Sequence, residues 1–175
     1  MRTRYIGAAV ALLTATAGAV VLSRSGADPE DLQTQIMTRM RTTLEQSSPE
    51  QHQHAGHGAT TAEAAVICGV RVYGYEPAEV TALADVKTVY GFHLCGVAEG
   101  QRPWDVAVKL AGPVILDMSS DPPCIQVVEA TAEVKYADRL RQMFPSPYAE
   151  LASKEALTTE EMADLRGRYD AAAGL

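Results

Sequence analysis

Three closely spaced histidines form the clearest metal-binding pattern in this sequence. His52, His54 and His57 lie in a segment that also carries glycine and alanine. Neutral imidazoles bind zinc, copper and nickel, and a glycine-containing loop can wrap several of them around one ion. Ordering such a loop costs conformational entropy, and no fourth ligand stands at a fixed spacing. We therefore favour a polar linker that contains histidines, and we keep copper or zinc handling by these three residues as the alternative. No other cofactor is expected.

The fourth histidine, His93, is the only candidate for acid/base chemistry. It falls in the middle of a predicted strand, and it would form an acid/base pair if Asp105 or Asp117 lay beside it in the fold. The chain has no Gly-x-Ser-x-Gly motif and no glycine-rich phosphate loop. A lone histidine among valines is more often a hydrogen-bonded structural residue. We expect no catalytic residues and rank a hydrolase-like enzyme with His93 as base below the other functions.

A third group of side chains suits binding. It comprises Tyr73, Tyr75, Arg102 and Trp104, of which the last is the only tryptophan. An exposed tryptophan would serve as an anchor for a partner. A buried one would fill the core between its own segment and the sheet, and we favour this second interpretation.

Three cysteines, Cys68, Cys95 and Cys124, occur without any Cys-x-x-Cys arrangement. Suppose that residues 68–75 and 87–97 pair as antiparallel strands. The residue numbers of each cross-strand pair then add up to about 162, which places Cys68 opposite Leu94 and next to Cys95. Cross-strand neighbours lie within reach of a disulfide. The sequence therefore predicts Cys68–Cys95, ahead of Cys95–Cys124, with three buried free thiols as the other alternative.

The hydrophobic pattern predicts an α+β fold with a long helix near the N-terminus. Residues 28–46 carry one apolar residue every four positions, at Leu32, Ile36, Met40 and Leu44. We interpret this segment as a stalk helix whose stripe packs against its own domain or projects from a membrane; self-association through the stripe is the alternative. Residues 47–61 read as a flexible histidine-containing linker, and residues 62–175 as a single α+β domain.

That domain is predicted to contain a small, mainly antiparallel sheet of three or four strands packed with short helices. Alternating patterns predict strands over residues 68–75 and 86–97, and a hairpin of residues 114–118 and 124–129. Residues 104–110 are predicted to be helical, because a Gly-Pro pair follows them. C-terminal helices are predicted over residues 136–144 and from Thr158 onward, where Thr158 and Glu161 form a capping box.

The N-terminal segment determines where we expect the protein to be. The run from Tyr5 to Leu22 has no charged residue, follows Arg2 and Arg4, and precedes Arg24. As a helix it would measure about 27 Å, close to the thickness of a bilayer core. Residues 1–24 are therefore a signal anchor or a signal peptide. We expect a single-pass protein of the cell membrane with its C-terminus outside, or a secreted protein if the segment is cleaved.

The net charge of the chain beyond Ala27 limits which kinds of partner we expect. Beyond Ala27 the chain has 12 basic and 22 acidic residues, a formal charge of −10. This charge argues against nucleic acid and against anionic membrane surfaces as partners. We expect a membrane-anchored or secreted, non-catalytic domain of bacterial composition, held at the membrane through Tyr5 to Leu22, that binds a protein partner or a small ligand.

This localisation can be tested with a reporter fused to the C-terminus. We expect the reporter to lie outside the cytosol, because the apolar run directs the following chain across the membrane. Cell fractionation followed by intact-mass measurement then distinguishes a retained anchor from a cleaved signal. A reporter active only in the cytosol would show that the export prediction is wrong.

Overall fold

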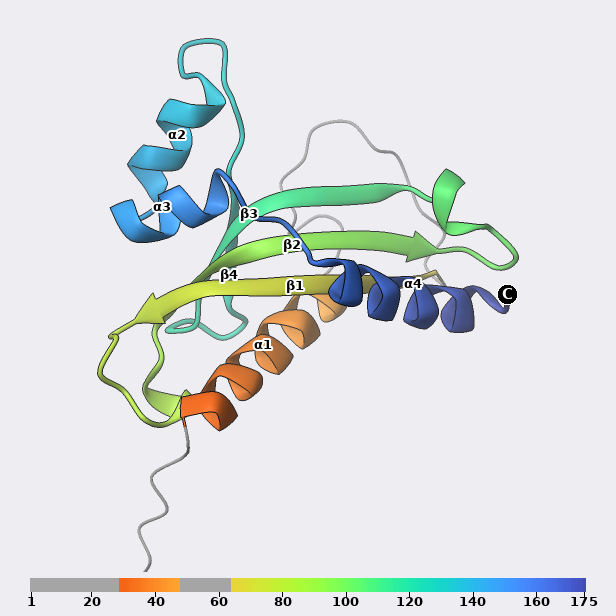
Figure 1. The fold of residues 1–175 in the computed structure, drawn as a ribbon, viewed down its shortest axis with the longest axis horizontal. Coiled ribbons are helices and arrows are strands. Elements are labelled where there is room, and N and C mark those ends of the chain that lie inside the picture. Colours follow the sequence, from red (N-terminus) through yellow and green to blue (C-terminus); the bar gives the residue numbers. More distant parts are fainter. Residues whose placement is uncertain (1–28, 48–63) are drawn as a thin grey trace, which may run out of the picture.

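The computed structural model describes residues 29–47 and 64–175, which form an α+β fold (Figure 1). An N-terminal helix precedes a four-stranded antiparallel sheet whose strands are neighbours in chain order, and three helices follow. The elements are α1 (Pro29–Gln46), β1 (Ala65–Glu76), β2 (Thr88–Ala98), β3 (Lys109–Asp117), β4 (Cys124–Val127), α2 (Tyr136–Met143), α3 (Ser146–Ala152) and α4 (Thr159–Ala173). This architecture confirms the predicted class and the C-terminal helices.

Helix α1 packs against one face of the sheet. Its apolar stripe is almost completely buried and belongs to one core cluster with side chains of β1, β2 and β3. The stripe comprises Leu32, Ile36, Met40 and Leu44, none of which is more than 2% exposed. Of the interpretations of this stripe, the structure shows packing against the protein's own sheet, since α1 and the strands share a core.

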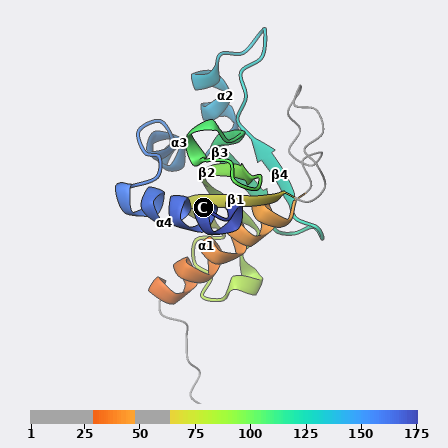
Figure 2. The ribbon, with the colours of Figure 1, turned by 90° about the vertical axis from the view of Figure 1, so that its right-hand side faces the viewer.

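Helices α2, α3 and α4 cover the opposite face (Figures 1 and 2). Close approach here depends on glycine in the strands. A Cβ atom on Gly96 would lie 2.7 Å from the Trp104 ring, and one on Gly74 would lie 2.2 Å from the Tyr148 ring. Because these two positions lack side chains, aromatic rings rest directly on the strand backbone. The sheet is thus buried on both faces.

The start and the end of α4 follow from local sequence. The Thr158 side chain accepts a hydrogen bond from the Glu161 amide, and the Glu161 carboxylate accepts one from the Thr158 amide. This is the capping box predicted from the sequence. Gly174, with φ of 72°, ends the helix in the left-handed conformation that glycine adopts at low cost.

The helix predicted over residues 104–110 is wrong. Only a single 3-10 turn, Trp104–Val106, forms there, and β3 already begins at Lys109. The Gly-Pro pair that suggested a helix end lies inside β3. The Pro113 carbonyl accepts a hydrogen bond from the Val128 amide, so this residue directs its backbone polar groups away from β2. The missing N–H of proline therefore costs no bond to β2.

The structure contains the predicted disulfide between Cys68 and Cys95. The two residues are directly opposite each other in the β1–β2 pair, one position away from the predicted register. Beyond them an irregularity between Val72 and Gly74 shifts the register by one more residue. The third cysteine, Cys124, is free and exposed at the start of β4. A disulfide is typical of proteins outside the reducing cytosol, which supports an extracytoplasmic domain.

Side chains from two helices occupy the outer edge of β1 at Cys68. The Cys68 N–H donates to Glu45 of α1 at 3.0 Å, and the Cys68 carbonyl accepts from Arg168 of α4 at 2.7 Å. Arg168 and Glu45 also form an ion pair at 3.0 Å. We call this arrangement of Glu45, Cys68 and Arg168 the edge clamp. It ties the helices on the two faces of the sheet to each other and to the disulfide.

Thiol labelling tests the disulfide. Protein denatured without reductant is expected to react at one thiol per chain, because only Cys124 is free among the three cysteines. The variant Cys124→Ser should then show none, and reduction should reveal two in that variant. Three reactive thiols in the untreated wild-type protein would contradict the bond.

Substitution of Arg168 tests the edge clamp. Arg168→Gln leaves Glu45 and the Cys68 carbonyl without their charged donor in a part-buried position, so the free energy of unfolding should fall by about 1–3 kcal/mol. The matched control is Arg166→Gln on the same helix, since Arg166 pairs with Asp105 where both side chains are more than half exposed. Urea denaturation should show the control to lie within about 0.5 kcal/mol of wild type. Equal effects of the two substitutions would mean that the clamp contributes nothing beyond a surface ion pair.

Candidate functional site

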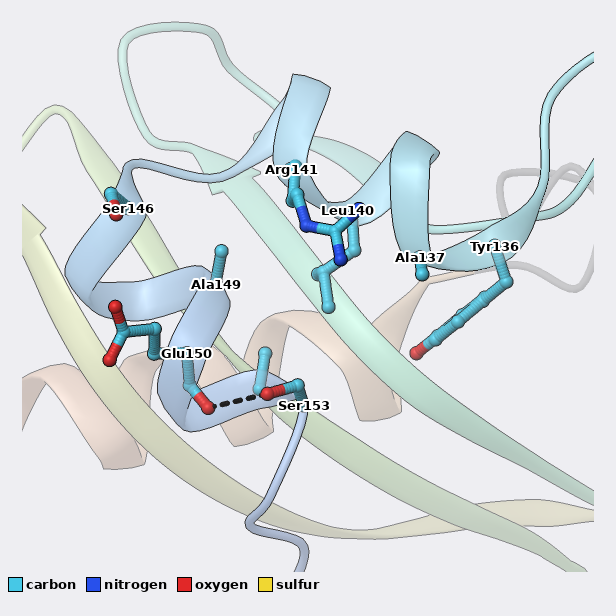
Figure 3. Close-up of a pocket in the computed structure, with 9 residues that line it drawn as sticks. Tyr136, Ala137, Leu140, Arg141, Ser146, Ala149, Glu150 and Ser153 are labelled. Atoms are coloured by element: carbon cyan, nitrogen blue, oxygen red, sulfur yellow. Dashed lines mark hydrogen bonds between the residues drawn. The ribbon is translucent and has the colours of Figure 1, made fainter.

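The candidate site is a groove between α2 and α3, which we call the α2–α3 groove. The two helices are separated by Phe144 and Pro145, and the ring of Phe144 is buried against Tyr90 of β2 with a centroid distance of 5.3 Å. Pro145 cannot continue a helix, and Pro147 suits the first turn of α3. The chain therefore turns sharply here and leaves two short helices with a space between them (Figure 3).

The groove has a volume of about 710 Å³. Its lining combines apolar side chains with hydroxyl and charged groups: Tyr136, Ala137, Leu140, Arg141, Ser146, Ala149, Glu150, Ala152 and Ser153. Leu140 and Ala149 are buried and also contact the core under the helices, whereas Tyr136 is 43% exposed. Pockets that bind small molecules have such volumes and a similar mixture of apolar and polar lining.

Five of the nine lining residues of the groove carry polar or charged side chains. Arg141 forms an ion pair of 2.8 Å with Asp138, one turn earlier in α2. The Ser153 hydroxyl donates to the Glu150 carbonyl at 2.7 Å, which satisfies the last turn of α3. In Figure 3 the Arg141 guanidinium extends toward the space between the helices, whereas the Glu150 carboxylate points outward from α3. A ligand in the groove would therefore meet an arginine, with the carboxylate directed away.

The structure places the predicted binding residues in different parts of the fold. Trp104 is buried, 6% exposed, and packs edge-on against Tyr169, as expected for a residue that fills the core. Arg102 pairs with Glu99 at 2.8 Å. Tyr75 is half-buried on the side of the sheet that α1 covers. These side chains and Tyr73 do not form one common surface.

Tyr73 lies on the other side of the sheet from α1. Its hydroxyl donates to the backbone carbonyl of Glu155, in the segment between α3 and α4. Burial, together with the nearby Glu155 charge, raises the pKa of Tyr73 to about 12. The phenol is therefore neutral at physiological pH, and it attaches β1 to the segment that leads into α4.

His93 is fully buried in β2. Its Nδ1 lies 2.9 Å from the Gly112 carbonyl oxygen in the neighbouring strand. The two expected acidic partners interact elsewhere, since Asp117 accepts hydrogen bonds from Ser119 and Asp105 pairs with Arg166. The structure thus places His93 as a cross-strand hydrogen-bonding residue and does not bring it to these carboxylates.

Two predicted features lie outside the described residues: the apolar run from Tyr5 to Leu22, and the metal candidates His52, His54 and His57. Within residues 29–47 and 64–175, no three His, Cys, Asp or Glu side chains are grouped so as to hold a metal ion. In the same two ranges, no helix is both long and apolar enough to cross a membrane.

Sequence reasoning did not find the α2–α3 groove. The segment Phe144-Pro145-Ser146-Pro147 was its only visible signal, and it indicated just the end of a helix. A groove arises from the angle between two helices, which no spacing of residues in one segment specifies. No protein-family model, curated protein or solved structure matches this chain. We therefore infer function from the residues and their geometry.

Proposed function

We propose that this protein is an exported, non-catalytic domain that binds a small ligand in the α2–α3 groove. The observation that carries the proposal is the groove itself, with a volume of about 710 Å³ and a lining of both apolar and polar side chains. This volume lies within the range of pockets that bind small molecules. The apolar run from Tyr5 to Leu22 would hold the domain at the membrane, or would be removed to release it.

The lining of the groove favours binding over catalysis. It contains no histidine and no cysteine, and its one carboxylate belongs to Glu150, which points outward. The Ser153 hydroxyl is engaged by a backbone carbonyl, so no base is positioned to activate it. Groups of this kind orient a ligand by contact and hydrogen bonding.

Export is supported by the disulfide and by the N-terminal sequence. The bond between Cys68 and Cys95 is buried, and such bonds form and persist in oxidising compartments. An exported domain of this kind would meet ligands of the extracytoplasmic space. It would bind them on a scaffold that the covalent bond stabilises.

A matched pair of tryptophan variants tests the groove. The probe is N-phenyl-1-naphthylamine, a neutral dye that fluoresces in apolar sites, and we expect saturable binding to the wild-type protein. Ala137→Trp places an indole in the groove from an exposed lining position, so the dye affinity should fall roughly tenfold, or 1.4 kcal/mol.

The control for this experiment is Gln142→Trp, an exposed position of the same helix that does not line the groove. It adds the same aromatic surface to α2 and should leave the affinity for the dye unchanged. Circular dichroism would verify that both variants are folded. Equal affinities of the wild-type protein and both variants would place the dye elsewhere and contradict the proposal.

A further inference from the structure

We infer that the α2–α3 groove selects an amphipathic anion: an apolar body that carries one carboxylate, sulfonate or phosphate group. This inference rests on the proposed function and adds the chemical class of the ligand. Three observations support it, namely the charge of α2, the position of Arg141, and the apolar surface beside it.

The first observation is that α2, one of the two helices that line the groove, is basic in an acidic protein. The whole chain carries 22 acidic and 15 basic residues. In α2 and the residue before it, the order is reversed, with Lys135, Arg139 and Arg141 against Asp138 alone. Of these three basic residues only Arg141 lines the groove. Lys135 and Arg139 add positive charge to the same part of the chain, and this charge favours an anionic ligand.

The second observation is the availability of Arg141. Its pair with Asp138 is at the surface, with 71% of the arginine side chain and 56% of the aspartate side chain exposed. Exposed pairs of this kind are weak, so the guanidinium can exchange Asp138 for an anion of the ligand at little cost. A guanidinium binds carboxylate, sulfonate or phosphate oxygens through two parallel hydrogen bonds.

The third observation is the apolar surface next to this arginine. Leu140, Ala149 and Ala152 line the groove together with the ring of Tyr136 (Figure 3). These side chains can bury the apolar body of a ligand whose charged group contacts Arg141. Ala149 and Ala152 are small, so the ligand can approach the α3 backbone. The groove therefore offers one charged and one apolar subsite.

A pair of dyes that differ by a single charged group tests this inference. 8-Anilinonaphthalene-1-sulfonate has the ring system of N-phenyl-1-naphthylamine with one added sulfonate. We expect the wild-type protein to bind the sulfonate dye roughly tenfold more tightly than the neutral dye. Arg141→Gln should remove this difference by weakening the sulfonate dye alone, because the substitution deletes the charge but keeps a polar side chain.

The control variant is Arg139→Gln, which removes the same charge from the same helix at a position outside the groove lining. It should retain the preference for the sulfonate dye. If the neutral dye binds as proposed and the sulfonate dye binds no more tightly, or if Arg141→Gln leaves the preference intact, the inference is overturned while the groove stands. If the neutral dye does not bind in the groove, the proposed function fails, and the inference fails with it.

Discussion

The fold depends on the disulfide and the two backbone hydrogen bonds that Cys68 forms. Its side chain is bonded to Cys95 of β2, its N–H to Glu45 of α1, and its carbonyl to Arg168 of α4. One residue of an edge strand thus connects the neighbouring strand and the helices on both faces. The disulfide closes a sequence separation of 27 residues, and by loop-entropy reasoning such a crosslink stabilises the fold by about 3–4 kcal/mol. The edge clamp also occupies backbone groups that could otherwise pair with another strand.

Several parts of the fold could be predicted because local sequence determines them. The four-residue spacing of apolar side chains in α1 defines its buried stripe, and Thr158 with Glu161 defines the start of α4. The disulfide was predictable because a short antiparallel pair allows few registers, so an error of one position still placed Cys68 beside Cys95. In each case the residues concerned act within one element or across one strand pair.

The errors arose where tertiary context decides. A Gly-Pro pair ends many helices, but in β3 the proline sits where its backbone polar groups face away from β2. Arg168 and Glu45 are 123 residues apart, and nothing in their local sequences links them. The groove likewise depends on the angle that Phe144 and Pro145 impose between α2 and α3.

The α2–α3 groove lies on a part of the fold that the edge clamp does not reach. Helices α2 and α3 lie toward one end of the sheet, whereas α4 and the Cys68–Cys95 disulfide lie toward the other end (Figure 1). They are attached through the cluster around Tyr90, Leu140 and Phe144, whereas the edge clamp belongs to the other end. The bonds at Cys68 therefore involve neither α2 nor α3. Buried side chains, among them Leu140 and Ala149, hold these helices on the sheet, so the groove rests on a different core cluster from the one that contains Cys68.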